Sequence, residues 1–248
     1  MRTLVLSMSI LVLVSTHAVA GGIELSANAC PDNPGALPTG TVDCAGGSGL
    51  VILGTWTPNE AISDLSNLDG SLDLSVQGDL NSSSTFWNWD PMSSCASVVR
   101  SNQARPTSGC ASPPYLDTWD VADAGTGIGA IQIFPSNERI VFTCYRPLPL
   151  TVAAGARLFG VQITIDGRQA VEGGGTCTGC TNTGCLVWLE GRPGSFGASN
   201  PSFLYGPDPT IGQSQAITNV FLINGAAACV GIVPVRKQTW GELKSLYR

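Results

Sequence analysis

Short apolar segments separated by turn-forming residues run along most of the chain. Two of them, Leu72–Val76 and Val161–Ile165, alternate strictly between apolar and polar residues. A period of two is typical of a β-strand with one buried and one solvated face. The hydrophobic pattern predicts strands at 50–56, 71–76, 130–134, 139–145, 157–165, 186–189 and 217–223.

The intervening stretches are rich in Gly, Pro, Asn and Asp, and a helical period is nearly absent before residue 235. About seven to ten short strands with irregular connections predict an all-β fold, an antiparallel β-sandwich. Such a sandwich is similar in architecture to immunoglobulin-like or cohesin-like modules. No internal repeat is evident, so we expect one sandwich domain over residues 21–233. A division into two modules near Asp117 stays open.

The first twenty residues have the pattern of a signal peptide. Arg2 precedes the mostly apolar run Thr3–Ser15, and Ala18-Val19-Ala20 fits a cleavage site before Gly21. The run is shorter than the roughly 20 residues of a membrane-spanning helix, and no later stretch is apolar enough to span. We therefore expect a protein with no transmembrane segment that is secreted or held at the surface of a bacterium.

The last fifteen residues differ from the rest in charge and period. Residues 234–248 hold four basic residues and one acid, whereas the whole chain carries a net charge of -6. Thr239 and Glu242 fit a capping box, and Trp240, Leu243 and Tyr247 would share one helical face. The pattern predicts a short amphipathic C-terminal helix that docks, either on its own sandwich or on a partner.

Charge and histidine content exclude several function classes. Charged residues make up 12% of the 248 residues, and the acidic balance argues against a nucleic-acid partner. The single histidine, His17, lies in the predicted signal peptide. The exported chain would thus lack histidine, which excludes Ser-His-Asp and Cys-His catalytic units and histidine-ligated zinc. An enzyme of this sequence would have to use carboxylates, Tyr, Lys or Cys alone.

Nine cysteines in a chain with a signal peptide indicate disulfide bonds. Because short loops close readily, the sequence favours Cys30 with Cys44 and Cys95 with Cys110. An odd number leaves one cysteine unpaired, and the partners of Cys144, Cys177, Cys180, Cys185 and Cys229 stay open. The C-x2-C spacing in 177–185 also fits half a zinc or redox motif, but the expected compartment favours bridges.

Two segments are candidate binding sites. In a strand, Trp87 and Trp89 would share a face and could stack on successive sugar rings, with Tyr115 and Trp119 nearby. The alternative is that these rings fill the core.

Calcium is the one cofactor considered, since three carboxylates in a Gly-containing loop resemble its ligands. The residues are Asp117, Asp120 and Asp123. The alternative is a solvated acidic loop.

The ending Thr239–Arg248 resembles that of a group of exported bacterial proteins. The likeness extends to the signal peptide, an early cysteine pair, the tryptophan-rich segment followed by a cysteine, the Arg139–Cys144 strand and the Gly175–Val187 loop. The resemblance implies a secreted, disulfide-linked β protein. It brings no activity, and so no catalytic residue is transferred to this chain.

The sequence hypothesis is a non-enzymatic secreted or cell-surface β-sandwich protein for attachment, protein interaction or glycan binding. Its partner would be an extracellular protein or polysaccharide. One alternative is a carboxylate-based glycoside hydrolase, because eighteen acidic residues are available for a catalytic pair. The other is a structural subunit of a surface layer or appendage, assembled through the odd cysteine or the tail.

Overall fold

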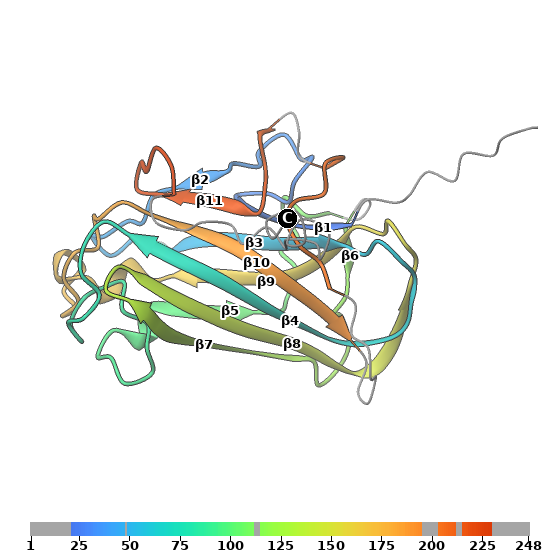
Figure 1. Ribbon diagram of the computed structural model, residues 1–248, viewed down its shortest axis with the longest axis horizontal. Helices are drawn as coiled ribbons and strands as arrows, with labels where there is room; N and C mark the ends of the chain where they lie inside the picture. Colours follow the sequence, from blue (N-terminus) through green and yellow to red (C-terminus); the bar gives the residue numbers. More distant parts are fainter. Residues whose placement is uncertain (1–20, 48, 112–114, 195–202, 212–214, 230–248) are drawn as a thin grey trace, which may run out of the picture.

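The computed structural model describes residues 21–47, 49–111, 115–194, 203–211 and 215–229. They form two packed sheets, as Figure 1 shows. The first sheet has the order β1 (Gly22–Ala27), β3 (Leu50–Thr57), β9 (Leu158–Ile165) and β5 (Val99–Asn102), and β6 (Leu116–Asp117) also pairs with β9. Three short 3-10 helices lie in the connections, at Ala96–Val98, Gly167–Gln169 and Val171–Gly173.

The second sheet contains the longest strands. Its order is β2 (Thr39–Gly40), β11 (Val220–Ile223), β10 (Gly184–Gly194), β4 (Ile62–Val76), β8 (Asn137–Val152) and β7 (Gly125–Phe134). All its pairs are antiparallel except β2 with β11, and in the first sheet only β6 with β9 is parallel. The expectation of an all-β, antiparallel-rich sandwich is confirmed.

Buried and exposed residues alternate along the long strands, and the buried ones enclose the core. On β4, Leu68, Leu72 and Leu74 are fully buried, while the intervening Asp69 is exposed. On β8, Ile140, Phe142 and Cys144 point inward in the same manner, between outward residues. The ring of Phe142 meets Trp188 of β10 edge to face, with centroids 5.4 Å apart. The two sheets thus share one large hydrophobic core.

Several expected strands are parts of longer ones. The segment 71–76 is the end of β4, and 130–134 is the end of β7. Both sheets combine strands from before and after Asp117, since β9 pairs with β3 and β8 pairs with β4. The expected signal peptide and C-terminal helix, including Trp240, Leu243 and Tyr247, lie outside the described residues.

The disulfide pairs proposed from short loops are wrong. The structure instead joins Cys30 to Cys110, Cys44 to Cys180, Cys95 to Cys177, and Cys185 to Cys229. The bridges span 44 to 136 residues, because the partners are set by which loops the sheets bring together, not by nearness in sequence. For example, the Cys30 amide donates to the carbonyl of Gly109, directly beside Cys110 (3.0 Å).

Cys144 is the free cysteine among the described residues, and it is buried. Burial raises the pKa of its thiol to about 12. The three cysteines of the 177–185 segment each take part in a separate bridge, so the segment is structural. No helix in the described part of the chain has the length and apolar character needed to cross a membrane.

Candidate binding site

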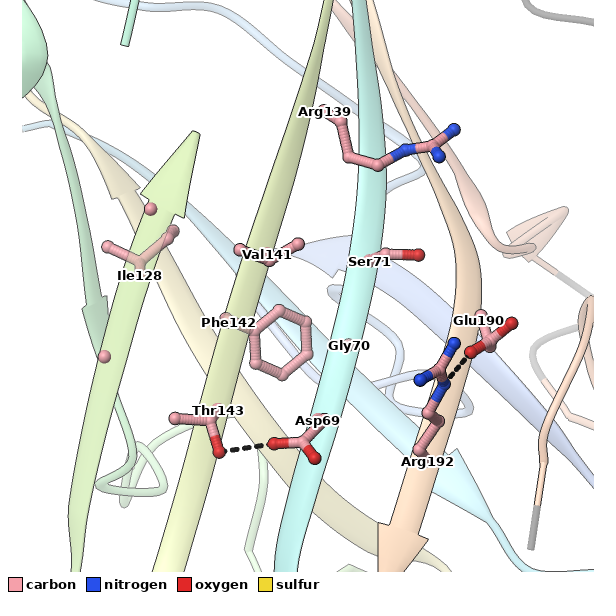
Figure 2. A pocket seen from close by; sticks show the side chains of 12 residues that line it. Asp69, Gly70, Ser71, Ile128, Arg139, Val141, Phe142, Thr143, Glu190 and Arg192 are labelled. Atoms are coloured by element: carbon pink, nitrogen blue, oxygen red, sulfur yellow. Dashed lines mark hydrogen bonds and ion pairs between the residues drawn. The ribbon is translucent and has the colours of Figure 1, made fainter. Parts of the chain in front are cut away.

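A groove of about 610 Å³ crosses the outer face of the six-stranded sheet, over β7, β8, β4 and β10 (Figure 2). Its residues come from four strands. Of these, only β7 and β8 are consecutive in the chain. The lining residues are Asp69, Gly70, Ser71, Gly127, Ile128, Gly129, Arg139, Val141, Phe142, Thr143, Glu190 and Arg192.

The register of the strands explains why the sheet is hollow here. Gly127 lies opposite Thr143, and Gly129 lies opposite Val141. Thr143 and Val141 point away from the core, so the outward positions beside them on β7 carry no side chain. The missing side chains leave the backbone of β7 open along one side of the groove.

Gly70 has a different role, because it faces the core. It pairs with Phe142 on the neighbouring strand, and a Cβ atom at Gly70 would lie 2.2 Å from the Phe142 ring. Figure 2 shows the ring of Phe142 lying across Gly70. Glycine at this position leaves room for the Phe142 ring, which lies directly beneath the groove.

Charged and polar side chains stand in pairs along the groove. The Thr143 hydroxyl donates to Asp69 (2.5 Å), and Arg192 forms an ion pair with Glu190, as Figure 2 shows. Arg139 binds both oxygens of Asp73 (2.8 and 3.0 Å), and this hydrogen bonding raises the pKa of the guanidinium. Each side chain is held in place by its neighbour and still presents polar atoms to solvent.

Exposed aromatic rings flank the groove. Leu204 exchanges two backbone hydrogen bonds with Gly191 of β10, which places its neighbours Phe203 and Tyr205 beside the outward residues of β10. The two rings stack with centroids 6.0 Å apart and are 40% and 41% exposed. The Arg192 guanidinium lies 5.3 Å from the centroid of Phe203.

On β8, Tyr145 points outward two residues beyond Thr143 and is 42% exposed. Its ring lies over Gly125, where a Cβ atom would come within 2.6 Å. Aromatic rings therefore stand both beside β10 and on β8, on the same outer face as the groove.

Two buried glutamates have raised pKa values, but they lie elsewhere. Burial raises the pKa of Glu24 to about 8, even though its carboxylate accepts hydrogen bonds from the Asp208 amide (2.8 Å) and the Thr55 hydroxyl (3.3 Å). Burial also raises the pKa of Glu138 to about 7. The hydrogen bonds that its two oxygens accept from the Trp89 amide (3.1 and 3.0 Å) lower the pKa and only partly offset this rise. Each holds a loop in place.

The aromatic platform expected from the sequence is wrong. Trp87, Trp89, Tyr115 and Trp119 are all buried, with at most 3% of any of them exposed. The indole of Trp87 donates to the Gly179 carbonyl (2.8 Å), and the segment forms turns instead of a strand. Stacking on a sugar needs an exposed ring face, which these residues lack; the alternative, that they fill the core, is confirmed.

The expected calcium loop does not gather its carboxylates. Asp117 accepts a hydrogen bond from the Trp119 amide (3.1 Å) and lies 3.6 Å from Arg105, while Asp120 and Asp123 are exposed. Within the described ranges, no group of three or more His, Cys, Asp or Glu side chains could hold a metal ion. A hydrogen-bonded turn followed by a solvated acidic stretch explains this segment.

The sequence interpretation missed the groove. The only local signal is Gly125-Thr-Gly127-Ile-Gly129, in which glycine occupies every second position of a strand. A second hollow of about 470 Å³ lies near the Cys185–Cys229 bridge, with Ser75, Thr183 and Ala226 to Ala228 among its lining residues. It lacks charged and aromatic side chains, which makes the groove the stronger candidate.

Comparisons with models of known protein families, with curated proteins and with solved structures found no match. The site is therefore interpreted from its own residues.

Proposed function

We propose that this chain is an exported bacterial β-sandwich protein that attaches to a saccharide through the groove on its six-stranded sheet. One observation carries the proposal: polar side chains in fixed pairs stand between the glycine positions of β7 and exposed aromatic rings on a single face. The same face offers both kinds of contact that a sugar ring needs.

A sugar presents hydroxyl groups around its edge and C–H groups on its faces. Asp69 and Glu190 can accept hydrogen bonds from hydroxyls, whereas Arg139 and Arg192 can donate them in a planar fork. Exposed rings such as Phe203 and Tyr205 can pack against C–H faces. Binding sites for small molecules commonly combine an apolar surface with a few fixed polar groups.

The cross-links support the proposed location. Four disulfides are typical of a protein that works in an oxidising compartment, as extracellular proteins do. The signal peptide predicted for residues 1–20 supplies a route of export.

Binding is favoured over glycoside hydrolysis by the positions of the glutamates with raised pKa. A glycosidase needs a protonated carboxyl group at the substrate, usually with a raised pKa. Glu24 and Glu138 have raised pKa values, but both are buried and line neither hollow. The carboxylates in the groove itself are held by Thr143 and Arg192.

The test is saccharide binding by the exported, oxidised protein, measured on a glycan array and then by calorimetry. Tyr205→Ala and Asp69→Ala should each weaken binding about tenfold or more, since aromatic contacts and polar contacts that the ligand shields from water dominate such sites. Met92→Ala is the control, because Met92 is exposed on a turn outside the groove. Absence of any bound saccharide, or full affinity in both groove variants, contradicts the proposal.

A further inference from the structure

We infer that the groove accepts an uncharged saccharide that lies directly against the backbone of β7, with Gly127 and Gly129 setting how closely it approaches. The inference rests on the proposed function and adds the ligand's charge class and two residues that determine specificity. It is supported by the groove's volume, by the surroundings of the two glycines and by the pairing of its charges.

The surroundings of Gly127 and Gly129 do not require glycine. Neither residue adopts a positive φ. A Cβ atom at Gly129 would meet nothing within 4 Å, and one at Gly127 would meet only the Thr143 methyl group at 3.9 Å, an ordinary contact. By contrast, Gly70 and Gly125 each lie under an aromatic ring that a Cβ atom would strike.

Glycine weakens the interior of a strand, because it loses more conformational freedom on folding and packs no side chain. Two such residues in β7 therefore reduce stability without relieving any clash. Glycine in a strand commonly marks a place where a ligand or another backbone comes close. Here the two bare positions border a hollow of about 610 Å³, which has room for such a ligand.

The charges along the groove balance and are already engaged. Asp69 and Glu190 supply two negative charges, and Arg139 and Arg192 supply two positive ones. Both guanidiniums are paired, Arg139 with Asp73 and Arg192 with Glu190. Among the described residues that line the groove, a uronate or sulfate group would thus meet no unpaired cation and would face two carboxylates, in a chain of net charge -6. Sugar hydroxyls can bond to the paired groups without separating them.

The experiment compares a neutral set of polysaccharides (β-glucan, mannan and galactan) with an anionic set (polygalacturonate and dextran sulfate). The proteins are the oxidised wild type, Gly127→Val, Gly129→Val and Gly129→Ala. Thr164→Val is the matched control, since Thr164 lies on β9 in the other sheet. Affinity and melting temperature are measured for each protein.

We expect the wild type to bind a neutral polysaccharide about tenfold or more tightly than any anionic one. Each valine variant should lose about tenfold or more in affinity, with a melting temperature equal to or above that of the wild type, because valine favours strands and its Cβ atom would meet no atom closer than 3.9 Å. Gly129→Ala should lie between, and Thr164→Val should bind normally.

The outcomes separate this inference from the proposed function. Should the wild type bind a saccharide and the valine variants bind it equally well, the role of the glycines is overturned while the proposed function stands. Tighter binding of an anionic polysaccharide overturns the charge class alone. If no saccharide is bound by the wild type, both fail. Should a valine variant fail to fold, Gly129→Ala, which adds only a methyl group, decides the point.

Discussion

Replacing Glu24 by glutamine tests whether a buried carboxyl group makes the stability of this fold depend on pH. Glu24 lies on β1 and is fully buried, and burial raises its pKa from 4.5 to about 8. Between pH 4.5 and about 8, Glu24 is protonated in the folded state but ionised in the unfolded state. The contribution of Glu24 to stability must therefore fall as pH rises from 4.5 to about 8, and level off above it.

The size of the effect follows from the change in pKa. Each unit corresponds to 1.36 kcal/mol, so the full rise amounts to about 5 kcal/mol of unfolding free energy. Glutamine has the shape of a protonated glutamate and keeps one oxygen to accept a hydrogen bond from the Asp208 amide or the Thr55 hydroxyl. The variant should match the wild type near pH 4.5 and exceed it by several kcal/mol near pH 8.

The assay is guanidinium unfolding with the disulfides intact, at several pH values across this window, with the difference between variant and wild type as the readout. Other titrating groups are common to both proteins and cancel in that difference. Glu138→Gln is a second variant, whose difference should develop over a lower range, from pH 4.5 to about 7. A difference for Glu24→Gln that stays constant from pH 4.5 to 8 refutes the argument.

Three further predictions concern the cross-links and the core. Non-reducing peptide mapping should find Cys30 joined to Cys110 and Cys95 to Cys177; recovery of a Cys30–Cys44 peptide would contradict the topology. Cys144 should resist alkylation in the native protein and react on denaturation, since its thiol is buried with a pKa raised to about 12; rapid native labelling is the contrary result. Trp87→Ala should cost about 3–5 kcal/mol of unfolding free energy, measured by denaturant unfolding, and a loss near zero would place the ring at the surface instead.

Alternation in the sequence is a good predictor of strands where one face is buried and the other is wet. It identified the final parts of β4 and β9, whereas β3, buried on nearly every position, was predicted from its run of apolar residues. β1 was not among the expected strands, although Ile23-Glu24-Leu25-Ser26-Ala27 also alternates. Both faces of this strand are buried, including Glu24 and Ser26. Alternation alone would therefore have given β1 a solvated face that the folded protein does not have.

The disulfide pairs and the tryptophans show what local reasoning cannot supply. Loop-closure entropy describes the unfolded chain, whereas the bridges follow the neighbourhood created by the sheets. Likewise, a period of two gives Trp87 and Trp89 a common face only if the segment is a strand. The segment forms turns, held by the bond from the Trp89 amide to Glu138, a residue 49 positions away.

The groove was hidden from the sequence because its parts come from four strands. Asp69 and Thr143 are 74 residues apart, and neither stands out in its own segment. The alternating glycines of β7 were visible, but their meaning depends on what lies beside them. Gly125 lies under Tyr145 and Gly129 lies in open space, a distinction that exists only in the folded molecule.

The cross-links give a physical reason why this fold can keep two unhindered glycines in a strand. Each bridge closes 44 to 136 residues and, in the chain-entropy account, stabilises the folded state by about 4–5 kcal/mol. The two glycines of β7 that relieve no clash cost about 1–2 kcal/mol together. A single bridge therefore outweighs both, and none of the four disulfides lines the groove. The disulfides thus stabilise the fold at positions outside the groove. Residues on the outer face of the sheet can therefore serve ligand binding even where they reduce stability.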